Sequence, residues 1–117
     1  MYADKDQYLT RNFRVAEMAC QCCGVCLMRD SFMAKLQALR EAYGAPIRVT
    51  SGYRCPAHNR QVGGAKDSQH VKGNAADLWA LDMYKLERLA KEIFTNAVPG
   101  PGFVHVDEGS KRNWEYK

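Results

Sequence analysis

Two of the three histidines in this 117-residue chain stand close to carboxylates. His70 begins the run HVKGNAAD, which ends at Asp77, and His105 lies in the run FVHVD. A loop that turns at Gly73 can bring His70 to Asp77, and His105 joins them if the strands that carry Asp77 and His105 are neighbours. Two imidazoles and one carboxylate suit Zn²⁺ and leave a fourth position for water, as in catalytic zinc sites. Zinc would polarise a scissile carbonyl and lower the pKa of that water.

The same residues also allow a simpler interpretation. A single histidine at a strand edge is usually only a hydrogen-bonded residue, and Asp77 could cap a turn. The third histidine, His58, lies in the polar segment PAHN. If His58 also bound the metal, it would occupy the position left for water. We therefore expect His58 to be a structural or solvent-facing residue.

Cysteine is the other residue type with metal-binding chemistry. Of five cysteines, four are crowded together as Cys20, Cys22, Cys23 and Cys26, and the fifth is Cys55. An odd, crowded set argues against the disulfide framework of a secreted protein. The crowded four could hold a second, structural zinc, although their spacing is tighter than in paired C-x-x-C sites, or could serve local packing. Cys55 is expected to be a small buried residue.

Hydrophobic periodicity predicts the elements that must position these residues. Apolar residues at helical spacing predict one helix over residues 31–43, with Asp30 as its N-cap, and a second from Asp82 to about Thr95. Alternating β-branched and apolar residues predict strands over residues 47–50, 75–79 and 103–107, with a further strand at 112–116. The predicted connections are a helical turn at 13–18, an irregular loop at 19–27, a polar loop at 52–68 with a helical turn near 57–62, and a turn at 99–102.

Three sequence segments occur in a characteristic order: SGYRCP at 51–56, SQHVKGNAAD at 68–77 and FVHVD at 103–107. Together they closely resemble the M15 family of zinc D-Ala-D-Ala carboxypeptidases and endolysin-type L-alanyl-D-glutamate peptidases, and best its compact subgroup with a C-terminal FVHVD strand. The resemblance implies Zn²⁺ bound by His70, Asp77 and His105. It also implies the α+β fold shared with the hedgehog signalling domain, a small, mainly antiparallel sheet flanked by helices. We expect residues 1–117 to form a single such domain.

The resemblance assigns further residues to substrate. Arg54 takes the position of the family's substrate-binding arginine, and a guanidinium can bind a free carboxylate through two parallel hydrogen bonds. The alternative is a surface arginine in a loop. Ser68 is expected either to hydrogen-bond substrate or the metal loop, or simply to cap its loop. Tyr53 and Gln69 are expected to line the pocket.

The general base departs from the family pattern. Many relatives place an acidic residue three positions before the last histidine ligand, where this chain has Gly102. Residues two apart in a strand face the same side, so Asp107 points with His105. Asp107 is predicted either to deprotonate the water as a catalytic base or to orient a histidine ligand, and we favour the second role. Glu108 should face the other way as a solvated charge.

The resemblance implies a hydrolase that cuts peptidoglycan stem peptides, either at the terminal D-Ala-D-Ala bond or at an internal bond. The missing acid at Gly102 motivates an alternative, a zinc-binding but non-catalytic binding or assembly module. A net charge of +4 without dense basic runs argues against nucleic acid as a partner, and no segment is apolar enough for membrane insertion. Residues 1–11 lack an apolar signal-peptide region. We expect a monomer that is cytoplasmic as synthesised and acts at the cell wall if released, as in phage or prophage lysis.

Overall fold

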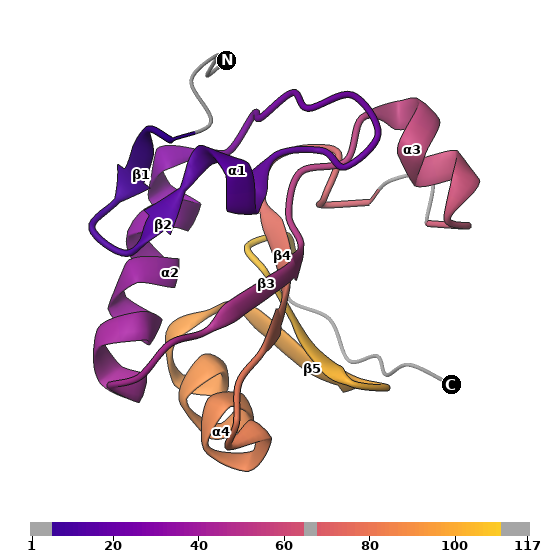
Figure 1. The fold of residues 1–117 in the computed structure, drawn as a ribbon. Helices are drawn as coiled ribbons and strands as arrows, with labels where there is room; N and C mark the ends of the chain where they lie inside the picture. The colour runs from indigo at the N-terminus through magenta and orange to yellow at the C-terminus, as the bar shows by residue number, and fades with distance from the viewer. Residues whose placement is uncertain (1–5, 65–67, 111–117) are drawn as a thin grey trace.

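The computed structural model describes residues 6–64 and 68–110, and within them the chain has the predicted α+β fold (Figure 1). Four strands form one antiparallel sheet in the order β3-β4-β6-β5, and β1 pairs with β2 in a separate short ribbon. The elements in chain order are β1 Tyr8–Thr10, β2 Phe13–Arg14, α1 Val15–Met18, α2 Asp30–Tyr43, β3 Arg48–Ser51, α3 Pro56–Gln61, β4 Ala75–Trp79, α4 Met83–Ile93, β5 Asn96–Gly100 and β6 Phe103–Asp107.

The two strands with the predicted chemistry are neighbours at the centre of the sheet. β4 pairs with β6 in antiparallel register, which places Asp77 directly opposite His105. β3 lies on the other side of β4, where Ser51 is the partner of Asp77. Both central strands are almost completely buried, although they carry the polar residues Asp77, His105 and Asp107. The condition for bringing His105 to Asp77, that these two strands are neighbours, is therefore met.

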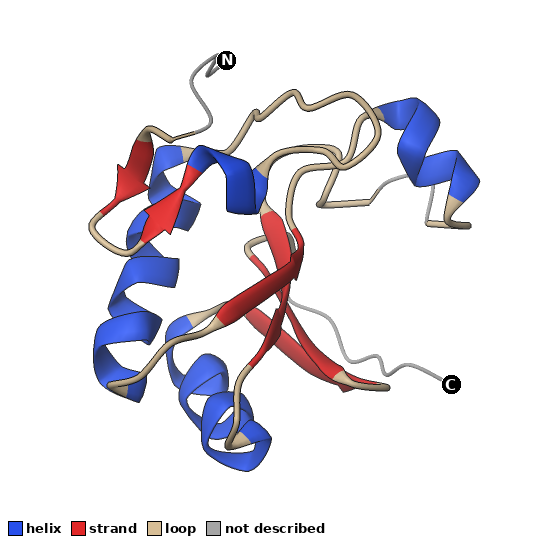
Figure 2. Ribbon diagram, viewed as in Figure 1, coloured by secondary structure: helices blue, strands red, loops and turns tan. Residues whose placement is uncertain are grey.

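Helices α2 and α4 pack together on one side of the sheet, whereas α3 lies apart from both (Figure 2). The apolar stripes of the two helices enter one core, and the ring of Phe32 in α2 lies 5.3 Å from that of Phe94. Asp82 caps α4 as predicted, since its carboxylate accepts from the Lys85 amide at 3.0 Å. Asp30 is instead the first residue of α2, and no side chain caps that helix at the preceding residue.

The main departure from the predicted elements is β5. The sequence predicts a helix to about Thr95 and a turn at 99–102, but α4 ends at Ile93 and residues 96–100 form a strand. Pro99 is tolerated because β5 is an edge strand. The turn that follows has Gly102 at φ +82°, a conformation that favours glycine. The predicted strand at 112–116 lies outside the described residues.

Two shorter elements agree in part with expectation. The helical turn predicted near 57–62 is α3, and the segment 13–18 contains the short strand β2 before the single turn α1. Among the described residues, no helix combines the length and apolar character needed to cross a membrane.

Candidate metal centre

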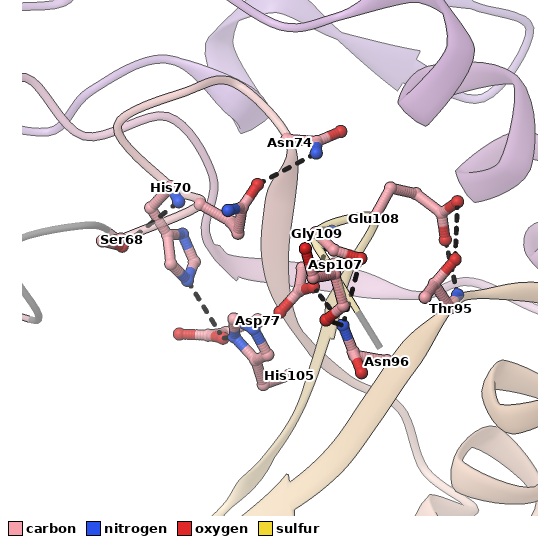
Figure 3. A network of polar contacts seen from close by, with 12 residues as sticks. Ser68, His70, Asn74, Asp77, Thr95, Asn96, His105, Asp107, Glu108 and Gly109 are labelled. Atoms are coloured by element: carbon pink, nitrogen blue, oxygen red, sulfur yellow. Dashed lines mark hydrogen bonds and ion pairs between the residues drawn. The ribbon is translucent and has the colours of Figure 1, made fainter. Parts of the chain in front are cut away.

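His70, Asp77 and His105 converge in a buried cluster over the central strands (Figure 3). One ligand atom from each lies within 4.8 Å of the other two. Oδ1 of Asp77 is 2.9 Å from Nδ1 of His105 and 3.4 Å from Nε2 of His70. The sheet register supplies Asp77 and His105, and the loop after α3 supplies His70.

The loop that carries His70 is held at both ends. Ser68 Oγ accepts from the His70 amide at 3.2 Å, and Gly73 turns the chain at φ +69°. A Cβ at Gly73 would collide with the carbonyl oxygen of Leu27, so only glycine fits this close approach. The predicted turn at Gly73 is therefore confirmed.

The imidazole of His70 has one nitrogen engaged and one free. Nδ1 lies 2.8 Å from the carbonyl oxygen of Gly52, which can only accept, so Nδ1 carries the proton. Nε2 is then a lone pair, and this buried atom has no hydrogen-bond partner among the described residues. A buried polar atom without a partner is costly, and a metal ion would satisfy it.

His105 is clamped between two carboxylates. Its Nδ1 faces Asp77, while Nε2 lies 2.7 Å from Oδ2 of Asp107 at the opposite edge of the ring. Asp107 is fully buried, and its Oδ1 accepts from Asn96 Nδ2 at 2.8 Å and from the Gly109 amide at 2.9 Å (Figure 3). This placement favours an orienting role for Asp107 over a base that reaches the water.

The electrostatics of the cluster favour charged carboxylates. Burial alone would raise the pKa of Asp77, but its hydrogen bond to His105 and its closeness to His70 hold that pKa well below its ordinary value. Burial likewise opposes ionisation of Asp107, yet His105, Asn96 and Gly109 lower its pKa to about 2. For His105, burial lowers the pKa, and the contacts with Asp107 and Asp77 raise it above its ordinary value.

The donor set fits a zinc ion. Nε2 of His70 and Nδ1 of His105 are neutral nitrogen ligands once each ring's other nitrogen is protonated, and Asp77 adds an anionic oxygen. Each histidine donates its remaining N–H to an oxygen, as zinc-ligating histidines generally do. Three protein ligands leave a position open for water or substrate.

Arg54 lies beside this cluster. Its Nη2 is 3.5 Å from Oδ2 of Asp77, the oxygen that does not face the histidines, and its side chain is 16% exposed. Nε is 3.2 Å from Ser51 Oγ, and Nη1 is 3.2 Å from Asn59 Oδ1. Arg54 is thus a partly buried, oriented guanidinium next to the candidate metal and not a surface loop arginine.

The other predicted substrate residues take different positions. Ser68 caps its own loop. The side chain of Gln69 accepts from Asn74 Nδ2 at 3.0 Å and closes the same loop. Tyr53 is 7% exposed and belongs to the hydrophobic core, and its contact with substrate stays a prediction. His58 lies on α3 outside the cluster, as expected.

Carboxylates for a general base are scarce among residues 6–64 and 68–110. Gly102 lies in the β5–β6 turn, so an acid there is indeed missing. Glu108 faces away as predicted, but it is not a solvated charge. It pairs with Lys35 at 2.5 Å and accepts from the Thr95 amide.

The cysteines that lie close together are not the four that the sequence predicted. Cys20 and Cys23 lie together, but their third partner is Cys55, from the start of α3. Cys26 is fully buried in the hydrophobic core. Cys55 is half-buried and packs against the core, so the prediction of a small buried residue is met only in part.

Two residues that orient side chains of this site were not predicted from the sequence. Asn96, which holds Asp107, lies in the unpredicted strand β5, directly opposite Asp107 in the register. The Gly52 carbonyl, which fixes the ring of His70, carries no side-chain signal. A prediction of β5 as a strand would have revealed Asn96.

Known proteins share this sequence pattern. Residues 11–108 match the family described as Peptidase M15. Zinc D-Ala-D-Ala carboxypeptidase of Streptomyces albus G is 40% identical over 91 residues, which cover 70% of this chain and 36% of that protein. Probable peptidoglycan L,D-endopeptidase MepK of Haemophilus influenzae is 36% identical, over 61% of this chain and 44% of that protein. Peptidoglycan L,D-endopeptidase MepK of Escherichia coli K12 is 32% identical, over 59% and 43%. The chain thus spans less than half the length of these relatives.

Proposed function

Because this chain belongs to the peptidase M15 family, we propose that it is a zinc-dependent peptidase that hydrolyses stem peptides of bacterial peptidoglycan. The observation that carries the proposal is the convergence of His70, Asp77 and His105 with the Nε2 lone pair of His70 unpaired. Relatives named as a zinc carboxypeptidase and a peptidoglycan endopeptidase supply the substrate class. The bond that is cut is either the terminal D-Ala-D-Ala bond or an internal one.

The chain's own residues prepare the site for this chemistry. Zinc, when bound, supplies a Lewis acid that polarises a scissile carbonyl and makes water more acidic. Asp77 and the two histidines hold the ion, and Asp107 and the Gly52 carbonyl fix the two rings. Arg54 presents a guanidinium next to Asp77, where it can bind a substrate carboxylate close to the metal.

One observation favours a second candidate, a zinc-binding module without catalysis. Gly102 stands where relatives carry an acid, and Asp107 lies behind the ring of His105. Such a module would bind stem peptides through Arg54 and leave them intact. The two candidates share the metal site and differ only in turnover.

The test is cleavage of defined peptides by the zinc-loaded chain, followed by mass spectrometry. A synthetic pentapeptide ending in D-Ala-D-Ala and purified peptidoglycan serve as substrates. Release of D-alanine identifies a carboxypeptidase, and internal fragments identify an endopeptidase. Cleavage should stop with a chelator and in His105→Ala, and it should persist in His58→Ala, a control outside the cluster. Binding without cleavage would favour the second candidate, and zinc-independent cleavage would contradict both.

A further inference from the structure

A second group of metal-ligating side chains lies outside the histidine cluster. The sulfur atoms of Cys20, Cys23 and Cys55 all lie within 4.8 Å of one another. Cys20 and Cys23 come from the loop after α1, and Cys55 is the N-cap residue of α3. The fold therefore brings together thiols from segments 35 residues apart. None of the five cysteines, all of which lie within the described residues, forms a disulfide.

The first two cysteines lie in a tight backbone turn. The Gly24 amide donates to the Cys20 carbonyl at 2.8 Å, and the Cys20 amide donates to the Val25 carbonyl at 2.7 Å. Gly24 has φ +76°, which lets the chain reverse directly after Cys23. Cys20 and Cys23 are separated by two residues, which is the C-x-x-C spacing of structural zinc sites.

Backbone amides point at the sulfur atoms. The Cys55 amide donates to Cys20 Sγ at 3.4 Å, and the His58 amide donates to Cys55 Sγ at 3.4 Å. Burial alone would raise the pKa of Cys20, but amides of Cys55, Cys23 and Cys22 lower it to about 7. Amide donors of this kind stabilise a thiolate, which is the form that binds metal.

Cys22 lies outside this group of three but next to it in the chain, between Cys20 and Cys23. Its thiol is exposed but interacts with Cys55, and its pKa is raised by partial desolvation and by the nearby charge of Cys55. Neighbouring thiolates repel one another, so several can ionise together only around a cation. Cys26 is fully buried, and its sulfur atom does not belong to the group formed by Cys20, Cys23 and Cys55.

We propose that Cys20, Cys23 and Cys55 bind a structural Zn²⁺, with Cys22 as the fourth ligand. Sulfur atoms about 2.3 Å from a tetrahedral zinc lie roughly 3.8 Å apart, so the observed cluster needs only a small contraction. Four thiolates leave no open position, which makes the site structural. This second zinc shares no ligand with the proposed peptidase centre.

The zinc would fix the segment that carries Arg54. Cys55 follows Arg54 directly, and the Arg54 amide donates to the His70 carbonyl at 3.2 Å. The preceding Tyr53 amide donates to the Met18 carbonyl at 2.8 Å. A metal at the cysteines thus ties the loop after α1 to the segment that holds Arg54 next to the histidine cluster. The role of the ion is to hold this loop in place.

The experiment isolates the cysteine site in the full chain. The double variant His70→Ala/His105→Ala removes the other centre, and the reduced protein is titrated with Co²⁺ under anaerobic conditions. We expect one equivalent to bind with an intense thiolate-to-cobalt charge-transfer absorption. The absorption should be lost in Cys23→Ser and in Cys55→Ser and kept in Cys26→Ala. No cobalt binding, binding without this absorption, or an absorption that depends on Cys26 would overturn the proposal.

A second measurement is needed because cysteine variants that cannot bind the metal could also fail to fold. X-ray absorption of the zinc-loaded double variant, with all cysteines present, should show sulfur neighbours at about 2.3 Å. Nitrogen and oxygen neighbours alone would overturn the proposal. A Cys22→Ser change should remove one sulfur neighbour, whereas an unchanged sulfur shell would overturn the assignment of Cys22. A disulfide that forms among the cysteines even with zinc present under reducing conditions would also overturn it.

Discussion

Asp107 and Asp77 contact opposite nitrogens of the same imidazole. Oδ2 of Asp107 is 2.7 Å from Nε2 of His105, and Oδ1 of Asp77 is 2.9 Å from Nδ1. The carboxylate of Asp107 accepts a hydrogen bond from the Nε2–H group of His105. Nδ1, which lies next to Asp77, is then the nitrogen available to a metal. Asp107 would therefore act on a metal at this site through His105.

The first prediction follows from this relationship. Asp107→Asn should weaken zinc binding at the histidine cluster by about 10–100-fold, because a neutral amide holds the imidazole less firmly. Competition with a chromophoric chelator measures the zinc affinity. The background is the Cys23→Ser/Cys55→Ser variant, so that the measurement reports only on the histidine cluster. Glu108→Gln is the matched control, since Glu108 faces away from the cluster. Unchanged zinc affinity with a large loss of kcat would instead indicate that Asp107 is the base.

Two conditions bring His70, Asp77 and His105 together, a turn at Gly73 and adjacent strands, and the structure meets both. Residue types predict the turn and the strands but leave the adjacency open, and the resemblance to the M15 family is what assigns the three residues to one metal. The strand pattern also predicts that Asp107 points with His105. Its contact with the far edge of the ring depends on side-chain geometry, which no pattern specifies.

Other parts depend on tertiary contacts that the sequence does not reveal. β5 contains Pro99 and Gly100, which signal a turn, yet its edge position in the sheet tolerates them. Cys55 joins Cys20 and Cys23 only because α3 begins next to the loop after α1. Tyr53 packs into the core because the segment after β3 passes along the end of α1, where the Tyr53 amide meets a backbone carbonyl.

The second prediction concerns Arg54 as a carboxylate-binding residue. Arg54→Lys keeps the charge but removes the planar fork, so kcat/KM for a peptide with a free terminal carboxylate should fall about 10–100-fold. A C-terminally amidated peptide should be affected much less, and the ratio of the two rates is the readout at saturating zinc. Arg60→Lys on the exposed side of α3 is the control. Equal losses for both peptides would contradict carboxylate recognition.

The third prediction concerns the glycine behind the His70 loop. Gly73→Ala should lower the free energy of unfolding by more than about 2 kcal/mol, because φ is +69° and the new Cβ would meet the Leu27 carbonyl. Gly63→Ala is the matched control, with the same φ of +69° and no atom within 4 Å, and should lower it by about 1 kcal/mol. Urea unfolding measures both values. Equal losses of unfolding free energy in the two variants would show that the contact with the Leu27 carbonyl adds nothing to the cost of the substitution.

The fourth prediction is a pH dependence at Glu108, which joins α2 to the start of β5. Its carboxylate pairs with Lys35 Nζ and accepts from the Thr95 amide and hydroxyl. Partial burial opposes ionisation, but these contacts lower the pKa below its ordinary value of 4.5. A lowered folded-state pKa means that the stabilisation is fully present above the unfolded-state value and declines as the pH falls through the folded-state value. Glu108→Gln should therefore lose about 1 kcal/mol of unfolding free energy at pH 7 and much less at pH 3. Urea unfolding at both pH values tests this prediction, with Glu92→Gln on the exposed side of α4 as the control. A loss that is the same at pH 3 and pH 7 would rule out the ionised carboxylate as its cause.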